Sequence, residues 1–394
     1  MSNNQSVAEF AKNFGLPAIV AESLGDFRYI RQQNNMTTPH HTPFRIALTA
    51  DFYDEAGAPR YADFGLDTFE GHDHIVVSKF SEHRGEITPD QLAGNRAALV
   101  LTPKVTANSL AGCEDLLAIS RFGVGYDSVD VEACTASNVL VTITPGAVDR
   151  PVAEATIGWM LALTHRMLQK DRLVRTGRWD DRSQYMGCEL RDRTLGVIGL
   201  GGIGRKLVQL LQGFGMRQPI VFDPFAPPEV IVESGVRKVE LDELLSTADF
   251  VSLHCPLNEQ TRGLIGADKL GLMKSDAYLL NLARGGIVDE DALYDALASR
   301  RIAGAALDCF ETEPVVTPHR LGKLDNVLLA PHSIAWTDEL FRDIGRTACQ
   351  SLLDLSLGRR PSGIVNPEVI DNAAFKEKWD RIRLGISSKI DSKN

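Results

Sequence analysis

Three ionisable side chains in the second half of the chain each follow closely on a short run of apolar residues. They are Arg284, Glu313 and His332. Such apolar runs are typical of strands buried on both faces of a parallel sheet. Because the carboxyl ends of parallel strands meet at one edge, where doubly wound sheets bind ligands, we expect the three side chains to converge there. A guanidinium, a carboxylate and an imidazole are the groups that a hydride-transfer enzyme needs.

Each of these residues also has a purely structural interpretation. An arginine after a strand is commonly part of a surface ion pair, and a lone histidine is more often structural than catalytic. The adjoining Gly285 and Gly286 favour a functional Arg284, since glycines there imply a close approach of the backbone. Glu311 is an alternative to Glu313 as the carboxylate beside the histidine.

A glycine-rich sequence earlier in the chain has the pattern of a dinucleotide site. The motif consists of Gly199, Leu200, Gly201, Gly202, Ile203 and Gly204. It follows the apolar run 195–198 and precedes a helix expected from about Arg205. In such a motif Gly199 permits the tight turn, Gly201 lets the backbone approach a pyrophosphate, and Gly204 allows close packing of helix and sheet. Glycine-rich turns also arise for packing alone, so the context has to support the assignment.

Asp223 supplies that context. It ends a second apolar run, 220–222, about 20 residues after the motif, where a carboxylate accepts hydrogen bonds from ribose hydroxyls. A 2'-phosphate there would meet a like charge, so the sequence predicts NAD rather than NADP. The alternative for Asp223 is a turn residue before Pro224, and Arg205 is either a pyrophosphate contact or a solvated side chain.

The alternation of apolar runs with helical spacers predicts an α/β fold of two doubly wound parallel-sheet domains, with the active site in the cleft between them. We expect an extension over 1–44, a substrate domain of 45–147 and 335–366, a nucleotide domain of 148–334, and a charged tail over 367–394. One long helix is expected from Pro151 to about Arg172.

Composition excludes several classes of function. The 394-residue chain carries a net charge of −10, which disfavours a nucleic-acid or anionic-membrane partner. Its 6 cysteines are scattered, and His72 and His74 have no third ligand nearby, so neither a disulfide framework nor a metal site is predicted. With no apolar run near the ~20 residues of a membrane span, we expect a cytoplasmic enzyme.

Several motifs in register make the chain resemble the D-isomer-specific 2-hydroxyacid dehydrogenase family over roughly 45–366. Besides the glycine motif they are 121–127, 152–154, 254–257 with Thr261, 281–286, 307–314 and 329–332. The resemblance implies that Arg284 binds the substrate carboxylate and polarises its carbonyl. It implies that His332 is the acid/base and that Glu313 orients it. The expected substrate is therefore a small 2-oxo or 2-hydroxy acid.

The same resemblance implies the remaining contacts. Substrate contacts are completed by Gly123, Val124, Gly125 and Trp336. Cofactor contacts are expected from Gly199, Gly201, Gly202, Ile203, Gly204, Arg205, Asp223, His254, Pro256, Thr261, Ala283 and Asp308. The aromatic residue at 336 is more similar to the glyoxylate and glycerate branch. The segment 157–163, apolar nearly all round, favours a homodimer, as does the subunit contact of the family in this region.

Two alternatives remain open at this stage. Oxidation of an inorganic anion such as phosphite fits the same residues, whereas formate dehydrogenases of the family carry glutamine where this chain has Glu313. Some relatives are instead NAD-binding transcriptional corepressors, against which the acidic charge and the lack of a recognisable nuclear signal argue. Turnover of 2-oxo acids with NADH distinguishes the three.

Overall fold

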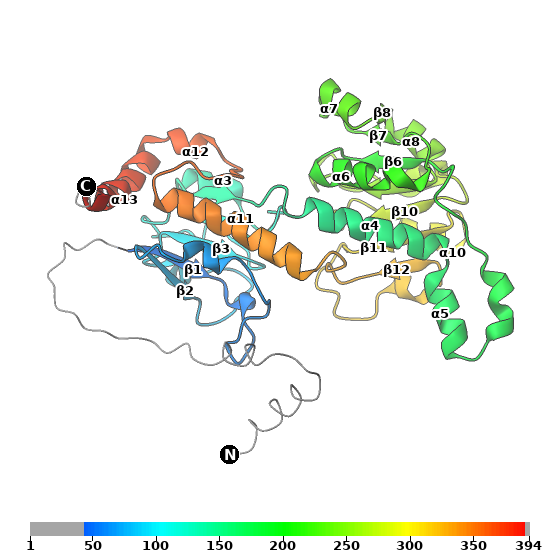
Figure 1. The fold of residues 1–394 in the computed structure, drawn as a ribbon, viewed down its shortest axis with the longest axis horizontal. Coiled ribbons are helices and arrows are strands. Elements are labelled where there is room, and N and C mark those ends of the chain that lie inside the picture. Colours follow the sequence, from blue (N-terminus) through cyan, green and yellow to red (C-terminus); the bar gives the residue numbers. More distant parts are fainter. Residues whose placement is uncertain (1–42, 391–394) are drawn as a thin grey trace, which may run out of the picture. The chain divides into compact units, whose positions relative to one another are not determined.

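A computed structural model describes residues 43–390, with side chains for 43–381. Residues 1–42, which hold almost all of the predicted extension, lie outside this part. The first sheet is parallel, in the order β2-β1-β3-β4-β5 (Figure 1). Its strands are β1 (Phe44–Leu48), β2 (Ile75–Lys79), β3 (Ala97–Val100), β4 (Ala118–Arg121) and β5 (Leu140–Thr142).

Helices cover both faces of this sheet. The amphipathic α11 (Asp338–Ser356) buries Leu340, Ile344 and Leu352 against one face. On the other face pack α2 (Pro89–Leu92) and α3 (Val131–Ala136). The strands are therefore buried on both sides, which explains their continuous apolar sequence.

The segment after Pro367, expected to be a charged tail, is helical instead. It forms α12 (Glu368–Asp371) and α13 (Ala373–Ile390). Phe375 is fully buried in the core of the first sheet, and Trp379 donates a hydrogen bond to the carbonyl oxygen of Leu355 at 2.8 Å. These two aromatic residues, four positions apart, give the helix an apolar side despite its many charges.

The second sheet, of parallel strands in the order β12-β11-β10-β9-β6-β7-β8, completes the predicted doubly wound fold. Its strands are β6 (Leu195–Ile198), β7 (Ile220–Phe222), β8 (Arg237–Lys238), β9 (Phe250–Leu253), β10 (Tyr278–Asn281), β11 (Gly304–Leu307) and β12 (Val327–Leu329). The direction of winding reverses between β6 and β9, the point at which such sheets bind ligands. The edge strand β8 consists of two exposed charged residues, so no apolar run signals it.

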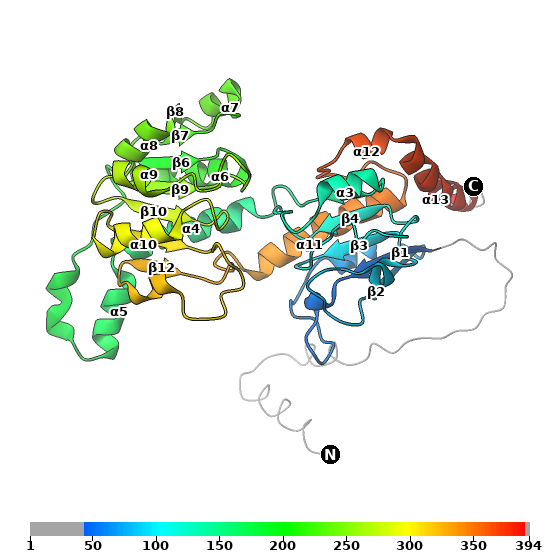
Figure 2. The ribbon, with the colours of Figure 1, turned by 180° about the vertical axis from the view of Figure 1, so that it is seen from behind.

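Helices again cover both faces. On one lie α4 (Asp149–Thr164) and α6 (Gly202–Leu210), and on the other α8 (Leu241–Thr247), α9 (Ala267–Leu272) and α10 (Glu290–Ala298) (Figures 1 and 2). The remaining helical segments are α5 (Met167–Arg175), α7 (Pro228–Glu233), η1 (Ala50–Phe52), η2 (Leu66–Phe69), η3 (Trp179–Tyr185), η4 (Leu211–Phe214) and η5 (Arg320–Lys323). Among the described residues, no helix combines the length and the apolar character needed to cross a membrane.

The long helix expected from Pro151 to Arg172 is in fact two helices. Right-handed helix ends at Thr164, because Arg166 adopts the left-handed conformation with φ of 54°. The chain then turns into α5.

Candidate active site

His332 and Glu313 lie side by side after β12 and β11. Nδ1 of His332 is 2.8 Å from Oε2 of Glu313, and the other carboxylate oxygen accepts a hydrogen bond from the backbone N–H of Phe310 at 2.9 Å. Burial raises the pKa of Glu313, but the bonds from His332 and Phe310 outweigh it and leave the pKa below its ordinary value. His332 itself has φ of 53°, an uncommon conformation that sets the direction of its ring.

Cys309 also faces this pair, which the sequence did not indicate. Its Sγ is 3.9 Å from Nε2 of His332. Each of Cys309, Glu313 and His332 has one possible ligand atom within 4.8 Å of those of the other two, an arrangement that could also hold a metal ion. Burial raises the pKa of Cys309, which favours the neutral thiol. The contact of His332 with Glu313 is the arrangement that a proton-transfer site needs.

Arg284 follows β10 and reaches the loop after β4. Its Nε donates to Oδ2 of Asp127 at 2.7 Å, and NH1 donates to the carbonyl oxygen of Ala283 at 2.6 Å. The guanidinium packs so closely on Gly125 that a Cβ at that position would overlap NH2 of Arg284. The structure thus brings Arg284 to the loop of Gly123, Val124 and Gly125, and Asp127 is a partner of Arg284 that the sequence did not indicate.

Gly285 joins the loops after β10 and β11. A Cβ on Gly285 would lie 1.8 Å from the carbonyl oxygen of Phe310. This confirms the predicted close approach of the backbone, because no larger residue fits without moving one loop. Arg284 and the segment that holds Glu313 are consequently fixed relative to each other.

The glycine motif forms the tight turn between the end of β6 and the start of α6. Gly199 has φ of 94°, and a Cβ there would lie 2.9 Å from the backbone of His254 and Cys255. A Cβ on Gly204 would meet the carbonyl oxygen of Gly199 at 2.4 Å, whereas nothing lies within 4 Å of one on Gly201. The backbone at Gly201 is therefore open to a ligand at the start of α6.

Asp223 lies at the end of β7 and binds this loop directly. Its Oδ2 accepts a hydrogen bond from the backbone N–H of Leu200 at 2.8 Å, and Oδ1 accepts from Phe225 and Ala226 at 2.9 and 3.0 Å. The exposed Arg205 donates through Nε to the carbonyl oxygen of Gly201 at 3.3 Å. Helix α6 begins at Gly202, with Ile203 in its first turn, rather than at Arg205.

His254 stands beside Gly199, after β9. Its Nε2 is 2.8 Å from Oγ of Ser252, and its Nδ1 is buried without a partner among the described residues. Burial lowers the pKa of His254 to about 4, so the ring is neutral at pH 7. In the loop that follows, Thr261 donates to the carbonyl oxygen of Pro256 at 2.7 Å.

Asp308, at the end of β11, holds the backbone just after His332. Its Oδ1 accepts hydrogen bonds from the N–H groups of Ser333 and Ile334 at 2.9 and 3.2 Å. Burial raises the pKa of Asp308 to about 6, against the lowering effect of these bonds. In the structure the carboxylate therefore orients the His332 turn.

Trp336 belongs to an aromatic cluster that the sequence did not reveal. Its ring meets the rings of Tyr61 and Phe341 edge-on, with centroids 6.0 and 5.1 Å away. Tyr61 and Phe341 are stacked on each other. Trp336 is 53% exposed, so one side of its indole remains free.

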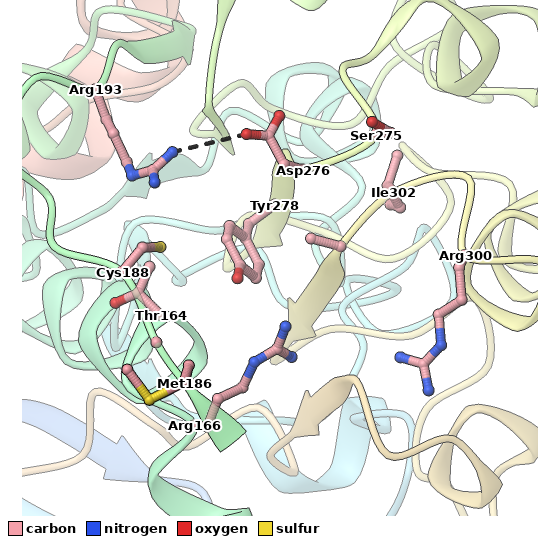
Figure 3. A pocket seen from close by; sticks show the side chains of 12 residues that line it. Thr164, Arg166, Met186, Cys188, Arg193, Ser275, Asp276, Tyr278, Arg300 and Ile302 are labelled. Carbon is pink, nitrogen blue, oxygen red and sulfur yellow. Dashed lines mark ion pairs between the residues drawn. The ribbon is translucent and has the colours of Figure 1, made fainter. Parts of the chain in front are cut away.

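A cavity of about 390 Å³ lies at the opposite edge of the second sheet. It opens beside the amino ends of β6, β10 and β11, where Arg166, Arg193 and Arg300 surround Tyr278 (Figure 3). None of the predicted site residues lines this cavity. It is thus separate from the edge that carries His332 and the glycine motif.

Comparison with known proteins supports the same interpretation. Residues 157–333 match the family model described as "D-isomer specific 2-hydroxyacid dehydrogenase, NAD binding domain". A glyoxylate reductase from Thermofilum pendens is 39% identical over 275 residues, 69% of this chain and 81% of that protein. A D-3-phosphoglycerate dehydrogenase from Methanocaldococcus jannaschii is 42% identical over 264 residues, 67% of this chain but only 50% of that protein.

The fold agrees with solved structures of such enzymes. The NAD-complexed D-isomer-specific 2-hydroxyacid dehydrogenase from Lactobacillus delbrueckii ssp. bulgaricus aligns with a TM-score of 0.66 and 26% identity. The alignment covers 82% of this chain and 100% of the other. The chain has the nucleotide motif and two parallel sheets, and it is similar in sequence to these relatives over most of its length. It therefore belongs to the D-isomer-specific 2-hydroxyacid dehydrogenase family and uses NAD as its cofactor.

Proposed function

We propose that the chain is an NAD-dependent oxidoreductase that interconverts a small 2-oxo acid and its D-2-hydroxy acid. The observation that carries the proposal is the 2.8 Å contact between His332 and Glu313. A carbonyl that receives a hydride must also receive a proton, and an imidazole beside a carboxylate is suited to hold one. His332 would donate this proton to the carbonyl oxygen in reduction and take it back in oxidation.

Arg284 and the loop of Gly123, Val124 and Gly125 would bind the substrate carboxylate. A guanidinium offers two parallel N–H groups to a carboxylate, and the loop adds backbone amides. The support is the close packing of Arg284 on Gly125. Asp127 holds Nε of Arg284 and so would aim the other nitrogens of the fork.

The residues around the glycine motif fit NAD. The open backbone at Gly201, ahead of α6, suits a pyrophosphate, and Asp223 carries the negative charge that disfavours a 2'-phosphate. His254, Pro256, Thr261, Ala283 and Asp308 would complete the contacts. When bound, NAD accepts or supplies the hydride.

Several finer assignments belong to the same proposal. The chain spans about half the length of the phosphoglycerate dehydrogenases that it matches, and 81% of the glyoxylate reductase. Because the aromatic residue at position 336 is more similar to the glyoxylate and glycerate branch of the family, the substrate would be of the glyoxylate, hydroxypyruvate or glycerate type.

The packing of α11 on the first sheet supports a substrate domain of 45–147 with 335–366, and a nucleotide domain of 148–334. We also propose a cytoplasmic homodimer.

A panel of 2-oxo acids with NADH tests the proposal. Reduction of glyoxylate or hydroxypyruvate, with kcat/KM lost in His332→Ala while NADH still binds, is the expected result. Failure of every acid in the panel, with NADH bound, would refute an oxidoreductase of this kind. Phosphite oxidation or partner binding without turnover would then be examined.

A further inference from the structure

The cavity at the amino edge of the second sheet has no part in the proposed reaction. Its volume of about 390 Å³ lies in the range of small-molecule sites, about 300–1,000 Å³. Three arginines from separate segments line it: Arg166 between α4 and α5, Arg193 before β6, and Arg300 after α10 (Figure 3). Among the described residues that line it, Asp276 is the only acidic one, so the cavity carries an excess of positive charge.

Tyr278, the first residue of β10, lies in the middle of this lining (Figure 3). It is only 5% exposed, and its ring stacks on Phe250 with centroids 5.5 Å apart, which fixes the ring. Its hydroxyl forms no hydrogen bond within residues 43–381. Burial raises the pKa of Tyr278, while the positive charges of Arg166 and Arg193 act in the opposite direction. The phenol therefore keeps its proton at pH 7 and is an unused, buried donor.

Arg166 is a second unused donor at the cavity. Its φ of 54° belongs to the left-handed region, which is uncommon for a residue with a Cβ. Within the part of the chain whose side chains are described, its guanidinium forms neither a hydrogen bond nor an ion pair. Arg193 is only partly engaged: Nε donates to the carbonyl oxygen of Glu189 at 2.9 Å, and NH1 is 3.8 Å from Asp276. Two cations and a phenol thus have donors left over for a ligand.

The arrangement of these donors indicates which anion fits. Because Arg166, Arg193 and Tyr278 come from three segments, their N–H and O–H groups approach from different directions. A carboxylate offers two oxygens in one plane, whereas a phosphate ester offers three acceptor oxygens and pairs well with guanidinium groups. Arg300 is already paired with Asp325 and adds mainly its charge. The cavity is therefore better suited to a phosphate than to a carboxylate.

We propose that this cavity binds a small organic phosphate ester, whose phosphate is held by Arg166, Arg193 and the hydroxyl of Tyr278. A volume of about 390 Å³ leaves room for more than a phosphate. Since Met186 and Ile302 also line the cavity, the carbon part of the ester would lie against these apolar side chains. The site is separate from the proposed active site and does not depend on the proposed function.

A second copy of the chain is the competing occupant, because the cavity lies beside the segment that follows α4. Two large apolar side chains of that segment, Leu168 and Trp179, are 53% and 63% exposed, but neither lines the cavity. The unused donors also include a phenol that is 95% covered by the protein's own residues, which a small molecule can reach. The structure therefore favours a small ligand.

Calorimetric titration of glycerol 2-phosphate into the full chain saturated with NADH tests the site. The probe is neither a 2-oxo nor a 2-hydroxy acid, and NADH occupies the glycine motif. We expect a Kd of about 1 mM or lower. Arg166→Gln should weaken binding about tenfold or more, and Tyr278→Phe, which keeps the ring, about three- to tenfold. Malonate, a dianion with two carboxylates, should bind more weakly than the ester.

Arg172→Gln is the matched control, because Arg172 is an exposed arginine of α5 that does not line the cavity. Its Kd should equal that of the wild type. Tyr278→Phe retains the contact with Phe250, so it tests the site even if Arg166→Gln fails to fold, which Tm measurements reveal.

A wild-type Kd above about 10 mM, or a Kd that neither Arg166→Gln nor Tyr278→Phe changes, overturns the site. Tighter binding of malonate than of the ester overturns the choice of phosphate. Sedimentation of the same variants examines the competing occupant. If the ester does not bind and Tyr278→Phe weakens self-association, the cavity receives a second copy of the chain and the proposal is wrong.

Discussion

The carboxylate of Asp223 and the backbone of Leu200 are joined by a hydrogen bond of 2.8 Å, which ties the end of β7 to the middle of the glycine motif. The residue proposed to select the cofactor thus also shapes the loop that receives it. The second oxygen of Asp223 holds the turn at Phe225 and Ala226. Charge and loop geometry therefore contribute to cofactor binding together, and substitutions can separate them.

Substitution of Asp223 should change the choice of cofactor. In Asp223→Ala we expect KM for NADH to rise by about tenfold or more, because a charged acceptor is lost, while NADPH is used equally well or better. Asp223→Asn keeps one acceptor for the loop but no charge, so it should relax the preference with a smaller loss of NADH affinity. Kinetics with both cofactors measure this. A wild-type preference for NADPH would contradict the role of Asp223.

Arg284 should dominate recognition of the substrate carboxylate. We expect Arg284→Ala to lower kcat/KM by about two to three orders of magnitude, the range for removing one partner of a buried, hydrogen-bonded charge pair. Arg284→Lys should restore only part of the loss, since an ammonium keeps the charge but not the two-pronged geometry. A lysine variant with wild-type kinetics would show that the position supplies charge alone.

Gly285→Ala should destabilise the protein at the site itself. The added Cβ would lie 1.8 Å from the carbonyl oxygen of Phe310, so one loop has to move, at a cost of about 1–3 kcal/mol. We expect a lower Tm and a lower kcat, because Arg284 and the Glu313 segment shift apart. Gly271→Ala in α9 is the control: nothing lies within 4 Å of its added Cβ, and its Tm should be unchanged or slightly higher. Equal Tm values for the two variants would contradict this.

The sequence was sufficient to predict the edge on which the main site residues lie. Arg284, Glu313 and His332 each follow a buried strand, and parallel strands end at one edge whatever the detail of their packing. The cofactor could be predicted too, because the glycine motif and Asp223 belong to one strand–helix–strand unit and so lie close together in the chain.

Contacts between distant segments could not be predicted in this way. Asp127 meets Arg284 across 157 positions of the chain, and Tyr61 meets Trp336 across an even longer separation. Local patterns also failed where packing decides the structure. Packing of Phe375 and Trp379 against the core stabilises a helix where the sequence looked like a charged tail. The left-handed backbone conformation of Arg166 divides an otherwise continuous helical pattern into two helices.

A homodimer should form through the region of α4 and α5. Next to the apolar α4, the segment 167–186 exposes large apolar side chains, among them Leu168 at 53%, Trp179 at 63% and Met186 at 78%. Large apolar side chains left exposed along one segment are a feature of subunit contacts. We expect a dimer in sedimentation at micromolar concentration, and about tenfold or greater weakening in Leu168→Glu with Trp179→Glu. A wild-type monomer at this concentration would contradict the prediction.

The pH profile tests the pairing of His332 with Glu313. Burial raises the pKa of Glu313, yet the hydrogen bonds from His332 and Phe310 bring it below the ordinary value, so the carboxylate is charged throughout the neutral range. That charge lies 2.8 Å from Nδ1 of His332, and reduction requires a proton on this imidazole. Glu313→Gln removes that charge at every pH but keeps the shape of the side chain.

In this variant the alkaline limb of the reduction profile should move to lower pH. The oxidation profile, which depends on the neutral imidazole, should move the same way. Kinetics in both directions across pH measure the shifts, and His332→Ala, expected to lose both activities while retaining NADH, serves as the control. Glu311 offers the sharper comparison, since it binds the backbone N–H of Glu290 instead, so Glu311→Gln should leave both profiles in place. If only Glu311→Gln moved them, the carboxylate that acts on His332 would be Glu311.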